Sequence, residues 1–174
     1  MFDPTIYDNL KVVIEGAIYD LDLCGEIEVT NRIDRVELAT MSRYYSLAFC
    51  LPDQSGSSAE LRLWADTGDL AGEILETDSS TGNRSFGCYL QPVFYKYVNN
   101  DDIENKCEAA KQVSHHIWGD ADLNQRISYT YGDPASRALL EISITFRRKF
   151  GEEVIEDIPQ MIGHMLMMLR ALNK

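Results

Sequence analysis

The sequence predicts an α+β fold in which an antiparallel sheet carries helices packed on one face. Two observations support this prediction. Amphipathic stretches at both ends of the chain repeat their apolar residues every three or four positions, as helices do. Residues 137–150 alternate instead, with Leu140, Ile142, Ile144 and Phe146 on one side and polar residues on the other. A strand with one polar face is typical of an antiparallel sheet that is wet on one side.

The length of 174 residues fits a single α+β domain spanning residues 1–174, without an internal repeat or a long linker. Hydrophobic residues make up 45% of the chain and aromatic residues 10%, which is enough to build a core. The expected element order is one helix, several strands, a second helix, two strands and a final helix.

The first helix is expected over about residues 4–23. Asp3-Pro4 is a typical helix start, and the apolar stripe consists of Leu10, Val13, Ile14, Ala17, Ile18 and Leu21. A β-hairpin is the alternative, because several residues of this segment are β-branched.

Strands are expected at residues 26–30, 35–39, 45–51, 61–65, 71–76 and 88–98. Polar residues predict a loop at 52–58, a turn at 66–69 and a longer loop at 78–87. Pro92 lacks an N–H group, so we expect the strand that contains it to lie at a sheet edge or to carry a bulge.

The second half begins with a helix over residues 101–118, which Gly119 ends, followed by strands at 125–131 and 137–150. The final helix includes Pro159, which does not fit an undisturbed helix interior. Either Asp157 caps a new helix near residue 158, or the helix kinks at the proline.

We find no sequence motif of catalysis and expect no catalytic residue, metal or cofactor. The nucleophile-elbow, phosphate-loop, dinucleotide and zinc-protease patterns are all missing from the sequence. Asp120, Asp122 and Asn124 begin like a calcium loop, but Gln125 and Tyr131 stand where its glycine and its glutamate belong. His115 and His116 are neighbours on a helix and point about 100° apart, so they do not readily share a metal ion.

The four cysteines are expected to be reduced thiols of a cytoplasmic protein. They are Cys24, Cys50, Cys88 and Cys107, and no two of them form the close pair that zinc sites use. Two disulfides in a secreted protein are the alternative, although a chain of this length can fold without them.

Charge limits the classes of partner. The formal net charge is −12, which argues against nucleic acid and against an anionic membrane surface. No apolar run approaches the roughly 20 residues that a membrane span needs. Residues 1–87 carry 16 acids and 6 bases, a net charge of −10. This half is either a solvated surface or a surface for a basic partner.

The final helix provides the candidate partner-binding residues, Met161, Met165, Met168 and Leu169. Its apolar stripe has to be covered, by the core, by a second copy of the chain or by a segment of a partner. Methionine repacks easily, which suits any of the three.

The order of elements resembles the type III secretion chaperone-like fold, α-β-β-β-α-β-β-α. The matching parts are residues 101–118 as the second helix, 125–131 and 137–150 as the hairpin, and 158–172 as the last helix. The resemblance implies a small, acidic, cytoplasmic protein that forms dimers and holds unfolded segments of partner proteins without catalysis.

We therefore predict a non-catalytic cytoplasmic protein-binding domain, chaperone-like or regulatory, with a protein partner or a homodimer contact. One alternative is a small-molecule-binding domain or an enzyme without a recognisable motif. Another is an acidic inhibitor or immunity-type protein that blocks a basic site on another protein.

Overall fold

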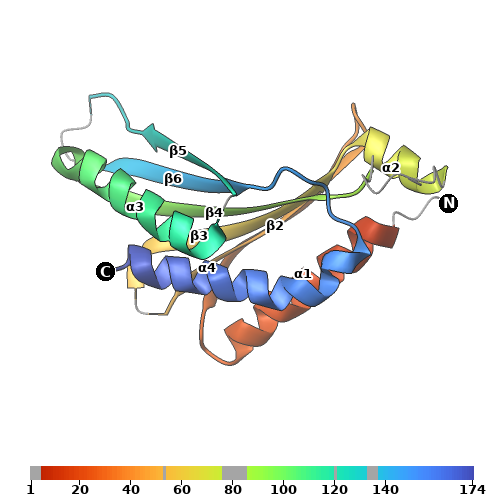
Figure 1. The fold of residues 1–174 in the computed structure, drawn as a ribbon, viewed down its shortest axis with the longest axis horizontal. Helices are drawn as coiled ribbons and strands as arrows, with labels where there is room; N and C mark the ends of the chain where they lie inside the picture. Colours follow the sequence, from red (N-terminus) through yellow and green to blue (C-terminus); the bar gives the residue numbers. More distant parts are fainter. Residues whose placement is uncertain (1–4, 53, 76–85, 120, 133–136) are drawn as a thin grey trace.

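The computed structural model describes residues 5–52, 54–75, 86–119, 121–132 and 137–174. Over these residues the chain forms two layers, a six-stranded antiparallel sheet and three long helices that cover one of its faces (Figure 1). The α+β fold expected from the sequence is confirmed.

The sheet has the strand order β1-β2-β3-β4-β6-β5, so β1 and β5 are its edges. Its strands are β1 (Glu28–Glu37), β2 (Ser42–Leu51), β3 (Gln54–Ala65), β4 (Tyr89–Val98), β5 (Asp122–Ser128) and β6 (Ala138–Thr145). The two runs expected at 26–30 and 35–39 belong to the single strand β1. A register shift between Val29 and Asn31 interrupts its alternation, which explains why the sequence shows two runs.

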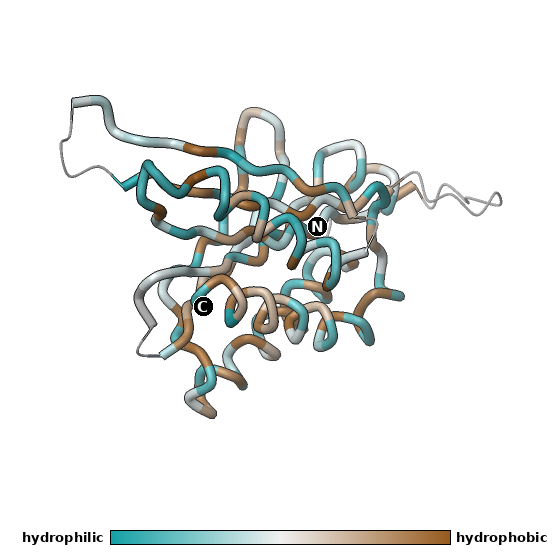
Figure 2. The backbone as a smooth tube through the Cα atoms, turned by 60° about the vertical axis from the view of Figure 1, so that its left-hand side comes forward, coloured by the Kyte–Doolittle hydropathy of each residue, from teal (hydrophilic) through white to brown (hydrophobic). Residues whose placement is uncertain are grey.

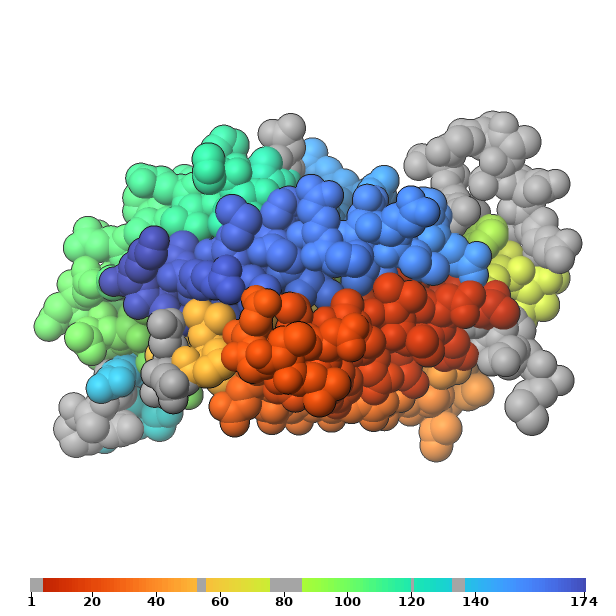
Figure 3. Space-filling view, turned by 90° about the horizontal axis from the view of Figure 1, so that it is seen from below, coloured from red at the N-terminus to blue at the C-terminus, as the bar shows by residue number. Residues whose placement is uncertain are grey.

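Three helices lie side by side on one face of the sheet, with α4 (Ile158–Leu172) between α1 (Thr5–Leu23) and α3 (Ile103–Trp118) (Figure 3). The segment at 5–23 is a helix and not a hairpin. Its buried residues Tyr7, Leu10, Ile14 and Ile18 recur every three or four positions, and burying that stripe outweighs the strand preference of its β-branched residues. Asp3 and Pro4, the expected helix start, lie outside the described residues.

Pro159 stands in the first turn of α4, where its missing N–H has no partner to lose. The short 3-10 helix η2 (Glu152–Asp157) precedes it. Of the two alternatives at this proline, the structure has a new helix beginning at residue 158.

Two local predictions are wrong. Residues 71–74 are not a strand but the end of the helix α2 (Thr67–Ile74), and residue 76 of the expected strand lies outside the described residues. At the start of α2 the Asp69 carboxylate accepts the N–H of Asp66 at 3.3 Å. The loop expected at 52–58 is shorter, because Ser57 and Ser58 already pair with β4. Long-range pairing here outweighs the polar character of the segment.

The strand that contains Pro92 is not an edge strand of the sheet, since β4 runs between β3 and β6, and no register shift is found at Pro92. It pairs with Leu61 on one side, whereas the pairing with β6 begins at Val93. At Pro92 itself β4 is therefore paired on one side only, which explains how the missing N–H is tolerated in this strand. The remaining boundaries shift by a few residues: β5 begins at Asp122, β6 ends at Thr145, and a 3-10 turn at Asn100–Asp102 precedes α3. Most of the loop expected at 78–87 lies outside the described residues.

The core lies between the sheet and the helices. Alternate strand residues face it, such as Tyr45, Leu47 and Phe49 of β2 and Leu140 and Ile142 of β6. Figure 2 shows hydrophobic and hydrophilic positions alternating along the helices, as expected of helices with one buried face. The other set of strand residues faces away from the helices and forms a second surface.

Candidate functional site

The surface of the sheet that carries no helix is rich in aromatic side chains. We call it the helix-free face, and it consists of the outward residues of the six strands. Its aromatic residues lie on the adjacent strands β2, β3 and β4, and they are Tyr44, Trp64, Tyr89, Tyr95 and Tyr97. None of them belongs to the core between sheet and helices. Tyr97 is 60% exposed.

Four of the outward residues form a row across four strands, in the order Arg35, Tyr44, Trp64 and Tyr89. The Arg35 guanidinium lies 4.5 Å from the centre of the Tyr44 ring. The rings of Trp64 and Tyr89 stack with centroids 5.1 Å apart and planes 13° from parallel. Stacked rings and cation–π contacts hold these side chains in fixed positions.

Beside this row, Glu60 is 8% exposed although it stands on the outward side of β3. Its Oε2 atom accepts hydrogen bonds from Arg62 Nε at 2.9 Å and from the Tyr95 hydroxyl at 2.8 Å. The Tyr95 oxygen also accepts a hydrogen bond from Arg62 Nη2 at 2.5 Å. Tyr44 approaches Oε1 at the longer distance of 3.5 Å. We call Glu60, Arg62 and Tyr95 the Glu60 network.

The electrostatics keep Glu60 ionised. Burial alone would raise the pKa of this carboxyl, but hydrogen bonds from Ser46 and Tyr95 and the charge of Arg62 outweigh burial and hold the pKa below its usual value. Burial, joined by Glu60, raises the pKa of the Tyr95 hydroxyl. Burial likewise raises the pKa of the Cys50 thiol on the same face.

These shifts bear on what the network can do chemically. A carboxylate with a lowered pKa is a weak base, and a hydroxyl or thiol with a raised pKa is a poor nucleophile at neutral pH. The pKa shifts therefore do not activate Glu60 as a base, or Tyr95 and Cys50 as nucleophiles.

The helix-free face is nearly neutral. Its outward charged residues are the acids Glu28, Glu37, Glu60, Asp122 and Glu141 and the bases Arg35, Arg62 and Arg126. Their formal charge of −2 contrasts with −12 for the whole chain. Among the described residues, which carry 22 acids and 15 bases for a formal charge of −7, most of the negative charge thus lies outside this face.

The methionine-rich helix is turned inward. Met165, Met168 and Leu169 are completely buried, and Met161 is 9% exposed. The sulfur of Met168 accepts the indole N–H of Trp118 at 3.3 Å. The core of the chain itself covers the candidate partner-binding residues, so they offer no open surface in this structure.

The other residues singled out from the sequence lie apart from one another. Asp122 forms two hydrogen bonds with Arg147, at 2.8 and 2.7 Å, so its carboxylate is already engaged. The four cysteines are free thiols, with Cys24 exposed and Cys88 buried. Within the described ranges, no three His, Cys, Asp or Glu side chains come together as a metal site. None of the helices in that part of the chain is long and apolar enough to cross a membrane.

Sequence reasoning missed the Glu60 network and most of the aromatic row. Tyr44, Trp64 and Tyr95 alternate along their strands with apolar residues that face the core. This alternation was the available signal that their rings point outward.

The fold and the face together define a two-layer α+β domain with an open, aromatic sheet surface. Comparison of the chain with protein-family models, with curated proteins and with solved structures finds no match.

Proposed function

We propose that this chain is a non-catalytic protein-binding domain and that its partner docks on the helix-free face. The observation that carries the proposal is the set of five aromatic side chains, of which Tyr95 belongs to the Glu60 network, on a face that no helix of the described chain covers (Figure 1). The expected chaperone-like or regulatory role and the cytoplasmic location remain part of this proposal. The four free thiols support a reducing compartment.

The composition of the face favours protein recognition. Tyrosine, tryptophan and arginine are the residues that most often dominate the energy of protein interfaces. Here they are held by stacking and by charged hydrogen bonds before any partner arrives. Side chains that are already ordered lose little conformational entropy on binding, so more of the contact energy appears as affinity.

Charge favours a basic partner. Two of the arginines on the face are paired within the chain, Arg62 with Glu60 and Arg126 with Glu141. Glu28 and Glu37, at the β1 rim of the face, form no ion pair with any residue that the structure describes. They can meet lysines or arginines of a partner, while the net charge of −12 attracts a basic protein over longer distances.

The test compares three immobilised baits: the unaltered chain, Tyr97→Ala and Tyr131→Ala. Tyr131 is 95% exposed and lies beyond β5, off the helix-free face, so its substitution is a matched control. Captured proteins are quantified by mass spectrometry, and each candidate is then purified and titrated at increasing salt.

Support is a basic protein that the unaltered chain and Tyr131→Ala both bind and that Tyr97→Ala binds about 30-fold more weakly, with affinity falling as salt rises. Equal binding to all three baits would refute the proposed face. Light scattering of the purified chain tests the remaining alternative, a homodimer. A dimer that Tyr97→Ala dissociates would mean that a second copy and not a basic partner occupies the face.

A further inference from the structure

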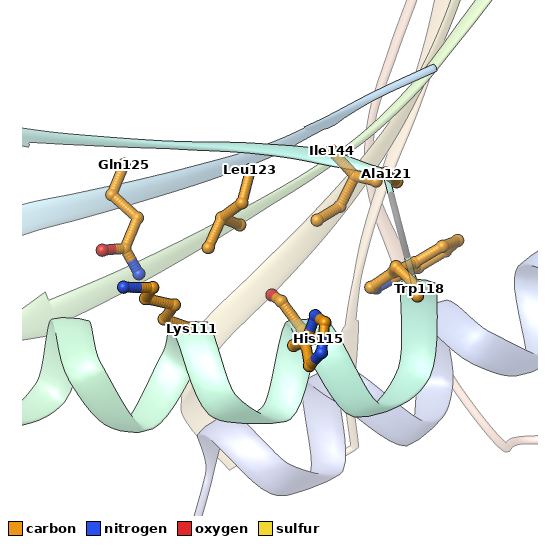
Figure 4. Close-up of a pocket in the computed structure, with 9 residues that line it drawn as sticks. Lys111, His115, Trp118, Ala121, Leu123, Gln125 and Ile144 are labelled. Atoms are coloured by element: carbon orange, nitrogen blue, oxygen red, sulfur yellow. The ribbon is translucent and has the colours of Figure 1, made fainter. Parts of the chain in front are cut away.

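A cavity of about 290 Å³ lies between α3 and β5, on the helix side of the sheet (Figure 4). The side chains that shape it are Lys111, His115, Trp118, Leu123, Gln125 and Ile144. Leu123 pairs with Ile144 and Gln125 with Ile142, which places them on the inward side of β5. The cavity is therefore separated from the helix-free face by the sheet, and it is independent of the proposed partner surface.

One end and the floor of this cavity are apolar and already in place. Leu123 and Ile144 form the floor, and Trp118 closes one end. The Trp118 ring is held by the hydrogen bond to Met168 and by edge-to-face contacts with Phe146 and His164, at centroid distances of 6.2 and 5.6 Å. A ligand would find this indole wall formed before it binds.

The other end of the cavity is polar. Lys111 of α3 and Gln125 of β5 point toward one another there, and His115 lies one turn along α3 from Lys111 (Figure 4). The Gln125 amide is fixed, because its Nε2 donates to the Cys107 carbonyl at 2.9 Å. Neither Lys111 nor His115 forms an ion pair with any residue in the described part of the chain.

Lys111 is an exposed cation with no ion-pair partner among the described residues, and its position next to an apolar floor indicates the chemistry of the ligand. A single lysine beside an imidazole suits one carboxylate better than a phosphate, which usually draws several cations or a helix N-terminus. At about 30 Å³ per water molecule the cavity has room for about ten waters, which fits a ligand of one or two rings.

We propose that this cavity binds a small carboxylic acid with a flat apolar body. The carboxylate accepts hydrogen bonds from Lys111 Nζ and from the imidazole of His115. The ring system lies on Leu123 and Ile144 and ends against Trp118. Burial of the ring provides most of the affinity, and the lysine selects for the acid.

The test uses 2-naphthoate as the probe and the two indole N–H signals of the ¹⁵N-labelled chain as reporters. The chain contains two tryptophans, Trp118 at the cavity and Trp64 on the helix-free face. A Trp64→Phe variant assigns the two signals. We expect 2-naphthoate to shift the Trp118 signal and to leave the Trp64 signal in place.

The charge is tested with Lys111→Met, and Lys106→Met is the matched control on the same helix but outside this cavity. Both substitutions remove one positive charge. Lys111→Met is expected to weaken 2-naphthoate binding about tenfold, and Lys106→Met to change it less than about twofold. The uncharged 2-naphthamide should bind the unaltered chain about as weakly as 2-naphthoate binds Lys111→Met.

Three results would overturn the proposal: no shift of the Trp118 signal at millimolar 2-naphthoate, equal effects of the two lysine substitutions, or a shift of the Trp64 signal instead. Because Trp64 and Trp118 report on opposite faces of the sheet, failure of this site and failure of the partner surface are read separately.

Discussion

Removing the hydroxyl of Tyr95 tests whether the Glu60 network stabilises the helix-free face. The Tyr95→Phe substitution removes the hydrogen bond to Glu60 Oε2 at 2.8 Å and the acceptor of Arg62 Nη2 at 2.5 Å. Hydrogen bonds to charged groups contribute about 1.5–3 kcal/mol each to stability. Tyr95 and Arg62 are only part-buried, so water partly replaces both bonds, and we expect a net cost of about 2 kcal/mol.

Tyr44→Phe is the matched control, since it removes the same group from the same face. Its hydroxyl lies 3.5 Å from Glu60 Oε1, at the outer limit of a hydrogen bond, so the expected cost is below about 0.5 kcal/mol. Both variants keep the aromatic ring and therefore the packing around it.

Urea unfolding of the three proteins, followed by circular dichroism at pH 7, measures both free energies. A Glu60→Gln background completes a double-mutant cycle with Tyr95→Phe, in which the coupling energy should exceed about 1 kcal/mol. If Tyr95→Phe costs no more than Tyr44→Phe, or if the cycle shows no coupling, the network does not stabilise this face.

The remaining predictions concern pH, thiols and the core. The folded-state pKa of Glu60 lies below its unfolded value of about 4.3. The difference in unfolding free energy between the unaltered chain and Glu60→Gln should therefore be fully present above that value and shrink as pH falls through the folded pKa. Urea unfolding from pH 7 to pH 3 measures this difference. Burial raises the pKa of the Cys88 thiol to about 12, so in a native-state reaction with a thiol reagent Cys24 is labelled at once and Cys88 only after unfolding. Met168→Ala should cost about 2–5 kcal/mol in thermal or urea unfolding, whereas Met167→Ala, at a position 52% exposed, should cost less than about 0.5 kcal/mol.

The elements that the sequence predicted well are those with a long and regular apolar pattern. In the final helix, residues from Ile158 to Leu172 repeat at helical spacing, and the side chains so marked are buried. In β6, the alternation from Leu140 to Ile144 matches the burial residue by residue. A regular pattern of this kind reflects one dominant burial direction, which local sequence records directly.

Elements determined by distant contacts were not predictable in this way. The segment 67–74 is too short for a helical stripe, and an ion pair joins its Asp69 to Lys149, which is 80 residues away in the sequence. The first part of β3 pairs with β4, although its polar residues Ser57 and Ser58 do not predict a strand. In both cases tertiary contacts outweigh local preference.

The candidate sites show the same limit more strongly. The Glu60 network joins residues of β3 and β4, and the cavity joins Lys111 of α3 to Gln125 of β5. Neither set has a spacing in sequence that would mark it. The methionines of α4 recur at helical spacing, and in the structure they are buried in the core. A helical stripe that binds a partner would show the same spacing, so the sequence alone does not distinguish the two.

If a partner docks on the helix-free face as we propose, two contributions to binding are separated, the attraction between the net charges and the contact energy of the face. Glu60 is already buried in the free chain and satisfied by Arg62 and Tyr95, so docking of a partner removes little further water from its carboxylate. Glu28 and Glu37 remain hydrated at the rim, where charges mainly raise the rate of association. In the complex that we propose, the rings of the aromatic row are part-buried beforehand, lose their remaining water on docking and slow the dissociation of the partner. On this proposal, the overall charge of the acidic chain attracts the basic partner, and the nearly neutral face holds it.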